Sequence, residues 1–227
     1  MDEAGGVSYQ RPDKSRFFVR AAVLVRENQI ETYQEVVKAI CSDFPTRNGK
    51  ELLFHTHRIF HGHDGWEQWA EQRRRELLTG MAEILIAENV PIVYACVDKK
   101  KMVEKYKKPI NPHLMTFIQC GEMVERWTHQ HARENMWIPC VGSNDFNREI
   151  EELFVSCRRF GSPFGWWERK WDVVMDVIAF TSPEKSNVFL LSDLCAWAFS
   201  RERQGKDSWG LYDALRPLVY AHKLFPR

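Results

Sequence analysis

Apolar residues follow two patterns along this chain, one typical of buried strands and the other of helices that cover a sheet. Continuous apolar runs rich in β-branched and aromatic residues predict strands at residues 17–25, 90–98 and 173–180. Two shorter strands are expected at residues 51–55 and in the segment MWIPCVG. These runs are too apolar to be strands with one solvated face, so we expect the sheet to be buried on both sides.

Between these runs, apolar residues recur at helical spacing. This periodicity predicts helices over residues 30–44, 66–85, 113–133, 146–157 and 189–199. A final helical extension is expected after Lys206, interrupted by Pro217. Alternating strands and helices predict an α/β domain over residues 1–205, with helices on both faces of its sheet, and a C-terminal helical tail over residues 206–227.

Composition narrows the class of protein. A chain of 227 residues can bury a hydrophobic core without disulfide bonds or structural metal ions. Its 32 Lys and Arg against 31 Asp and Glu give a net charge of +1. A constitutive nucleic-acid binder is usually more basic, but a hydrolase that holds phosphates through metal ions need not be. Apolar runs of about 20 residues and an export signal are both absent, and the six cysteines form no C-x-x-C pair. We therefore expect a cytoplasmic protein with reduced thiols and no membrane contact.

Several acidic residues stand beside predicted strands or inside an apolar helix: Asp2, Glu3, Glu51 (with His55), Asp145 and Asp193. Asp193 is the most informative, because an ionised carboxylate inside the apolar run FLLSDLCAW is costly unless it is paired or bound to metal. It serves a metal site or catalysis, or it is a structural acid in a helix capped by Ser192 or paired with Arg201 or Arg203. Converging carboxylates suit two Mg²⁺ or Mn²⁺ ions that hydrolyse a phosphodiester. This agrees with the absence of a G-x-S-x-G elbow, a P-loop and a G-x-G-x-x-G turn.

Four segments of the chain also match a known set of motifs in order and spacing. Asp2-Glu3-Ala4-Gly5 matches a D-E-S-G motif, LFHTHRIFHG an E-x-H segment, VYACVDKKKM a strand ending in D-K-K, and KSNVFLLSDLCAW a Q-x-x-D helix. On these segments the chain resembles the bacterial and phage family called domain of unknown function 3800, which is grouped with the ribonuclease H-like fold. The resemblance spans roughly residues 2–203.

The resemblance implies a ribonuclease H-like mixed sheet and a site at its edge. It transfers catalytic roles to Asp2, Glu3, His55 and Asp193, and a two-ion Mg²⁺ or Mn²⁺ site to Asp2, Glu51, Asp145 and Asp193. Leu190 stands where the family has Gln, and Leu53 stands where it has an acid. Two interpretations stay open: a metal-dependent nuclease, or a module that kept the fold, lost ligands and binds a partner protein.

Histidines are concentrated in one short segment that contains His55, His57, His61 and His63, with His129 and His131 later. Such residues build zinc sites, but alternating histidines on one segment do not easily reach one ion, and no cysteine lies near them. We expect exposed loop histidines, with His55 alone beside the acidic site.

Two basic segments are candidates for contact with DNA or RNA. The residues concerned are Lys99, Lys100, Lys101, Arg158, Arg159, Trp166, Trp167, Arg169 and Lys170. Arg and Lys can hold a phosphate backbone while aromatic rings stack on unpaired bases. The alternatives are a solvated helix face for the lysines and a core role for the tryptophans. A protein partner or a second copy of the chain is the other candidate, through the Trp-rich segment or the C-terminal tail.

Overall fold

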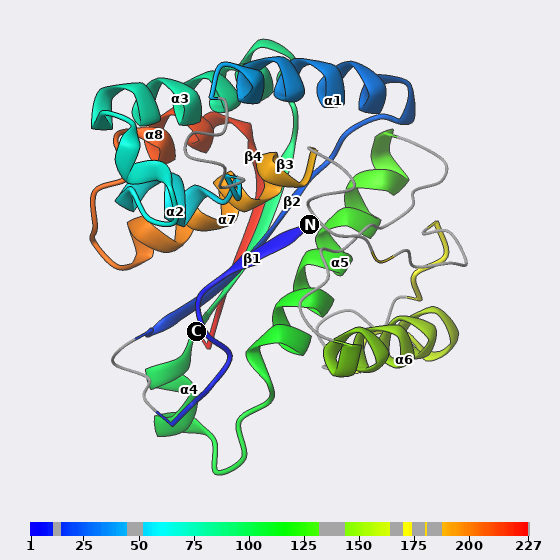
Figure 1. Ribbon diagram of the computed structural model, residues 1–227. Coiled ribbons are helices and arrows are strands. Elements are labelled where there is room, and N and C mark those ends of the chain that lie inside the picture. Colours follow the sequence, from blue (N-terminus) through cyan, green and yellow to red (C-terminus); the bar gives the residue numbers. More distant parts are fainter. Residues whose placement is uncertain are drawn as a thin grey trace.

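A computed structural model describes residues 1–10, 15–44, 52–131, 144–163, 170–173, 180 and 188–226 of the chain. In this part, four strands form one mixed sheet in the order β1 (Asp2–Ala4), β2 (Phe17–Val23), β3 (Ile92–Asp98) and β4 (Val219–Phe225) (Figure 1). Neighbouring strands are antiparallel from β1 to β3, whereas β4 runs parallel to β3.

Both central strands are buried because helices cover the two faces of the sheet. Every residue of β3 is buried, and the strands predicted at residues 17–25 and 90–98 are confirmed. Alternate side chains point to opposite faces of a strand. Val19 and Ala21 accordingly face one core cluster, whereas Ala22 faces another.

One face is covered by five helices, as Figure 1 shows: α1 (Glu27–Ser42), α2 (Thr56–His61), α3 (Glu71–Ala87), α7 (Val188–Arg203) and α8 (Leu211–Leu215). The opposite face is covered by α5 (Pro112–His131) and α6 (Asn144–Phe160). The short helix α4 (Lys99–Lys105) follows β3 directly. The molecule is therefore a mixed α/β structure with helices on both faces of its sheet, as the hydrophobic pattern predicts.

Most of the predicted helices are present. Those over residues 30–44, 113–133, 146–157 and 189–199 correspond to α1, α5, α6 and α7. The helix predicted over residues 66–85 is divided, because Trp69 and Ala70 are extended and separate the 3-10 helix η1 (Trp66–Gln68) from α3. The strands expected in MWIPCVG and at residues 174–179 lie outside the described residues.

Two predicted elements are wrong. Residues 52–55 form no strand and lead into α2, because the His55 side chain accepts a hydrogen bond from the backbone N–H of His57 and so caps a helix. The C-terminal extension is helical only in α8 and η3 (Arg216–Leu218), and it then becomes β4. Pairing with the edge of β3 satisfies the backbone groups of β4, so the tail is part of the sheet.

The described helices include none that is both long and apolar enough to cross a bilayer. Five of the six cysteines lie in the described residues, and all five are free thiols, as predicted. Cys96, Cys120, Cys157 and Cys195 are buried. Burial raises the pKa of Cys96 and Cys120 to about 12, so these thiols are un-ionised core residues.

Candidate metal-binding site

Asp193 lies inside α7, a helix that is buried from Phe189 to Ser200. The residue is only 4% exposed, and its Oδ2 accepts a hydrogen bond of 2.6 Å from the backbone N–H of Thr56. Arg201 and Arg203 do not provide the counter-charge, because they donate to the carbonyl of Asp207 and to the hydroxyl of Tyr94. The structural alternative of an Asp193–arginine pair is therefore wrong.

His55 brings an imidazole to the same carboxylate. Its Nε2 lies 3.6 Å from Oδ1 of Asp193, and its side chain is 53% exposed. The hydrogen bond between Nδ1 and the backbone of His57 fixes the ring so that Nε2 is the nitrogen that faces Asp193. The exposed imidazole of His55 thus lies between solvent and the buried carboxylate of Asp193.

Asp2 is the third member of this group, although it comes from the other end of the chain. It lies in β1 opposite Ala21, whose neighbours on this face belong to the core that contains α7. Burial, then the negative charge of Asp193 and then that of Glu3, raise the pKa of Asp2 to about 8. A buried carboxylate that also experiences the charge of a second acid is short of positive charge, and a divalent cation would relieve this condition.

Glu3 is not gathered with these residues. It lies opposite Arg20 in the register of β1 and β2, on the sheet face that α5 covers, and its Oε2 is 3.1 Å from Nη2 of Arg20. His113 of α5 completes the group, with Nδ1 at 3.5 Å from Oε1 of Glu3 and at 2.8 Å from Nη2 of Arg20. Burial and the Arg20 charge lower the pKa of His113 to about 3, so its ring is neutral and accepts from Arg20. Glu3 neutralises a buried arginine and is not placed for the role expected of it beside Asp2.

The other two predicted ligands lie partly or wholly outside the described residues. Glu51 is not described, and of Asp145 only the backbone is described, within the first turn of α6. The next residue, Phe146, contacts the ring of His113 at 4.9 Å between centroids. The described site therefore consists of Asp2, His55 and Asp193.

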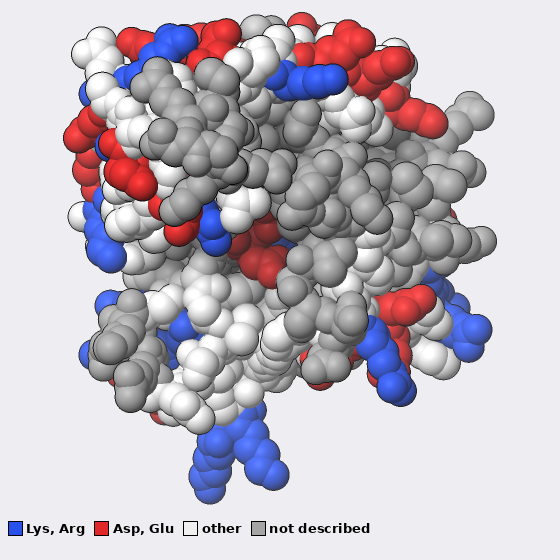
Figure 2. Space-filling view, viewed as in Figure 1, with Lys and Arg blue, Asp and Glu red and all other residues white. Residues whose placement is uncertain are grey.

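Acidic side chains are visible over β1 in a recess at the centre of the face shown in Figure 2. Leu53, which stands two residues before His55, is 48% exposed, whereas Leu190, in the first turn of α7, is buried in the core. These two positions carry no polar group toward the site.

The residues predicted to contact nucleic acid do not form one surface. Lys99 is only 1% exposed, and its Nζ donates to the carbonyls of Gly6 at 2.6 Å and Ser8 at 3.2 Å. Its expected phosphate contact is therefore wrong, because a buried ammonium already bonded to two carbonyls cannot reach solvent. Lys100 and Lys101 are exposed on α4, away from α6, which carries Arg158 and Arg159 (Figure 1).

The Trp-rich segment is described only in part. Trp166, Trp167 and Arg169 lie outside the described residues, and Lys170 is exposed. Trp171 is buried in the core beneath α5 and α6, which is the structural alternative for this aromatic segment.

The remaining histidines of the N-terminal half lie close together on the surface. The ring centroids of His57, His61 and His63 are 4.6 to 6.3 Å apart, and all three residues are exposed. Burial, neighbouring imidazoles and Arg201 lower the pKa values of His57 and His61. The expected exposure of these histidines is confirmed, but His57 and His61 belong to helix α2 and not to a loop.

One further group of ligand-type side chains was missed in the sequence. Glu125, His129 and Asp172 offer oxygen or nitrogen atoms that all lie within 4.8 Å of one another. The signal was the four-residue spacing of Glu125 and His129 on a predicted helix, which places them on one face. Asp172 had no such signal, because its approach depends on tertiary structure.

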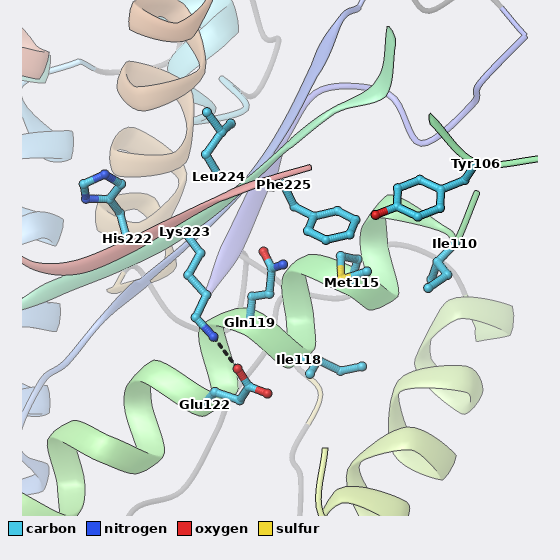
Figure 3. A pocket seen from close by; sticks show the side chains of 10 residues that line it. All are labelled: Tyr106, Ile110, Met115, Ile118, Gln119, Glu122, His222, Lys223, Leu224 and Phe225. Carbon is cyan, nitrogen blue, oxygen red and sulfur yellow. Dashed lines mark hydrogen bonds and ion pairs between the residues drawn. The ribbon is translucent and has the colours of Figure 1, made fainter. Parts of the chain in front are cut away.

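A pocket of about 480 Å³ opens elsewhere, between α5 and β4 (Figure 3). Tyr106, Ile110, Met115 and Phe225 form an apolar end, and an ion pair between Lys223 and Glu122 lies at the other. Its lining includes none of Asp2, His55 and Asp193, so this pocket and the acidic site are separate features.

Comparisons with models of protein families, with characterised proteins and with solved structures found no match for this chain.

Proposed function

We propose that this chain is a divalent-metal-dependent nuclease in which Asp2 and Asp193 hold Mg²⁺ or Mn²⁺. The supporting observation is a buried Asp2 whose pKa is raised to about 8, first by burial and then by the negative charges of Asp193 and Glu3. Burial and the charge of Asp193 disfavour the ionised form of Asp2, so its ionisation near neutral pH costs free energy. A site that binds cations accounts for that cost, since carboxylate oxygens are the ligands that Mg²⁺ and Mn²⁺ prefer.

The side chains present fit this group of cations. Thr56 holds Oδ2 of Asp193 at 2.6 Å, so the carboxylate is oriented before any ion binds. Asp2 is buried within the electrostatic influence of Asp193, and the exposed His55 reaches Oδ1 of Asp193. The bound ions would activate a water and stabilise the leaving oxygen of a phosphodiester. His55, exposed beside this carboxylate, would exchange a proton with the attacking water or the leaving group.

The direct test is cleavage of labelled single- and double-stranded DNA and RNA in the presence of Mn²⁺ or Mg²⁺. Asp193→Asn should abolish cleavage, because the amide keeps the acceptor for Thr56 but removes the charge that attracts the ion. Asp43→Asn is the matched control, since Asp43 is an exposed acid at the end of α1. Circular dichroism and melting of each variant separate loss of chemistry from loss of fold. Cleavage that survives Asp193→Asn or a chelator contradicts the mechanism.

A second candidate function is a catalytically decayed module that binds a partner protein. The exposed Leu53 favours it, because the family that the chain resembles has an acid at that position. Phe160, at 79% exposure the most exposed large apolar side chain of the described residues, offers an apolar contact at the end of α6. Absence of any cation effect on the melting temperature would favour this module over the nuclease.

A further inference from the structure

Glu125, His129 and Asp172 form a second group of metal-type ligands, remote from Asp193. Glu125 and His129 lie one turn apart on α5, which covers the opposite sheet face from α7. Asp172 comes from the short described segment at residues 170–173, which runs beside that helix. The group therefore joins two parts of the chain on the α5 face.

All three ligand atoms lie within 4.8 Å of one another, and the two separations from His129 are close to those around one small ion. Nε2 of His129 lies 2.8 Å from Oδ1 of Asp172 and 3.5 Å from Oε1 of Glu125. Around a tetrahedral ion with bonds of about 2.0–2.2 Å, neighbouring ligand atoms stand about 3.3–3.6 Å apart. The longer contact already has this spacing, and the shorter one reaches it by a small rotation of Asp172, whose side chain is 64% exposed.

Glu125 supplies the independent observation. Its side chain is only 3% exposed, and its Oε1 accepts from the backbone N–H groups of Asp172 at 2.7 Å and Val173 at 3.1 Å. Its Oε2 is also buried but has no hydrogen-bond partner among the described residues. Leaving a buried carboxylate oxygen unpaired costs about 1–3 kcal/mol or more. A cation bound at the group would offset the negative charge of this buried carboxylate.

We propose that Glu125, His129 and Asp172 bind one transition-metal ion of the Zn²⁺ class, which links α5 to residues 170–173. One imidazole with two carboxylates favours Zn²⁺, Co²⁺ or Mn²⁺ over Mg²⁺ and Ca²⁺, which take oxygen ligands. Three protein ligands leave one position of a tetrahedral ion for water. The site differs in ligands and in location from the site of Asp2 and Asp193, and it does not depend on nuclease activity.

Titration with Co²⁺, followed by visible absorption, tests the proposal without any substrate. The wild-type protein and Asp2→Asn should both bind one Co²⁺ ion at this site, Zn²⁺ should displace it, and excess Mg²⁺ should not. His129→Gln should weaken the binding at least tenfold, or about 1.4 kcal/mol. Glu125→Gln should do the same, and His129→Gln remains informative if that buried variant fails to fold.

His57→Gln is the matched control, because His57 belongs to the other histidine group. It should leave the Co²⁺ spectrum and affinity unchanged. The proposal is overturned if Co²⁺ does not bind, if His129→Gln binds it as the wild type does, or if His57→Gln rather than His129→Gln removes it. A protein that binds Co²⁺ here but cuts no nucleic acid supports this site and contradicts only the proposed nuclease.

Discussion

Oε2 of Glu3 lies 3.1 Å from Nη2 of Arg20, and this ion pair assigns Glu3 a different role from its neighbour Asp2. Arg20 has no exposed surface, so it depends on Glu3 for its counter-charge and on His113 for a hydrogen bond. Successive residues of a strand point to opposite faces. One dipeptide therefore supplies a structural carboxylate to the α5 face and a candidate metal ligand to the α7 face.

This arrangement predicts opposite effects of two conservative substitutions. Glu3→Gln should lower the free energy of unfolding by about 3 kcal/mol, because it leaves a buried guanidinium without its counter-charge. It should keep the response of the melting temperature to Mn²⁺. In a His129→Gln background, which lacks a ligand of the second proposed site, Asp2→Asn should lose that response without a comparable loss of stability. Urea unfolding and melting curves with and without Mn²⁺ measure both effects, and a Glu3→Gln protein of wild-type stability would contradict the assignment.

The raised pKa of Asp2 predicts a pH dependence of stability. In metal-free protein the folded state keeps the Asp2 proton up to about pH 8, whereas the unfolded state loses it near pH 4. The folded state thus binds more protons in this window, so the free energy of unfolding falls as pH rises from about 4 to about 8. Asp2→Asn removes this contribution.

The test is to measure the free energy of unfolding in urea for the wild type and for Asp2→Asn, at several pH values and in the presence of a chelator. The two proteins should be similarly stable near pH 4, and the variant should be more stable at pH 8 by on the order of 2 kcal/mol, allowing for partial solvation of Asp2. Mn²⁺ should close the gap at pH 8, because it binds the ionised form. Parallel pH curves for the two proteins would show that Asp2 is not perturbed.

Addition of cations should raise the melting temperature if the acidic site is intact. Ligand binding to the folded state adds RT ln(1 + [L]/Kd), or about 2.7 kcal/mol at a hundredfold excess over Kd. For a chain of this length that corresponds to about 5–10 °C. We expect the shift with Mn²⁺, a smaller one with Ca²⁺, and no shift in Asp2→Asn carrying His129→Gln, which lacks a ligand of each proposed site. A flat melting temperature across millimolar Mn²⁺ would favour the decayed module.

Lys99 should behave as a core residue and not as a phosphate contact. Lys99→Met keeps the length of the side chain but removes the hydrogen bonds to Gly6 and Ser8. Hydrogen bonds from a charged group contribute about 1.5–3 kcal/mol each, so the loss of unfolding free energy should be of this order. Lys101→Met, at an exposed position on the same helix, should change stability by less than about 0.5 kcal/mol. Equal stability of the two variants would contradict the buried role.

The sequence alone determined the elements whose character is local. Residues 17–23 and 92–98 are strands because their apolar runs suit a sheet covered on both faces, and α5 and α7 follow the helical spacing of their apolar residues. The burial of Asp193 was also predictable, because its neighbours along the helix are apolar on every side.

Tertiary structure alone decided how distant residues meet. Val219–Phe225 is a strand because the edge of β3 is available to it, and a local pattern cannot report such a non-local partner. The opposite roles of Asp2 and Glu3 follow from the register of β1 against β2, which sets the face to which each side chain points. Asp172 approaches Glu125 and His129 only because its backbone donates to a carboxylate on α5. The sequence gives the chemistry of each side chain. Pairing and packing between segments far apart in the chain decide which of these groups share a site.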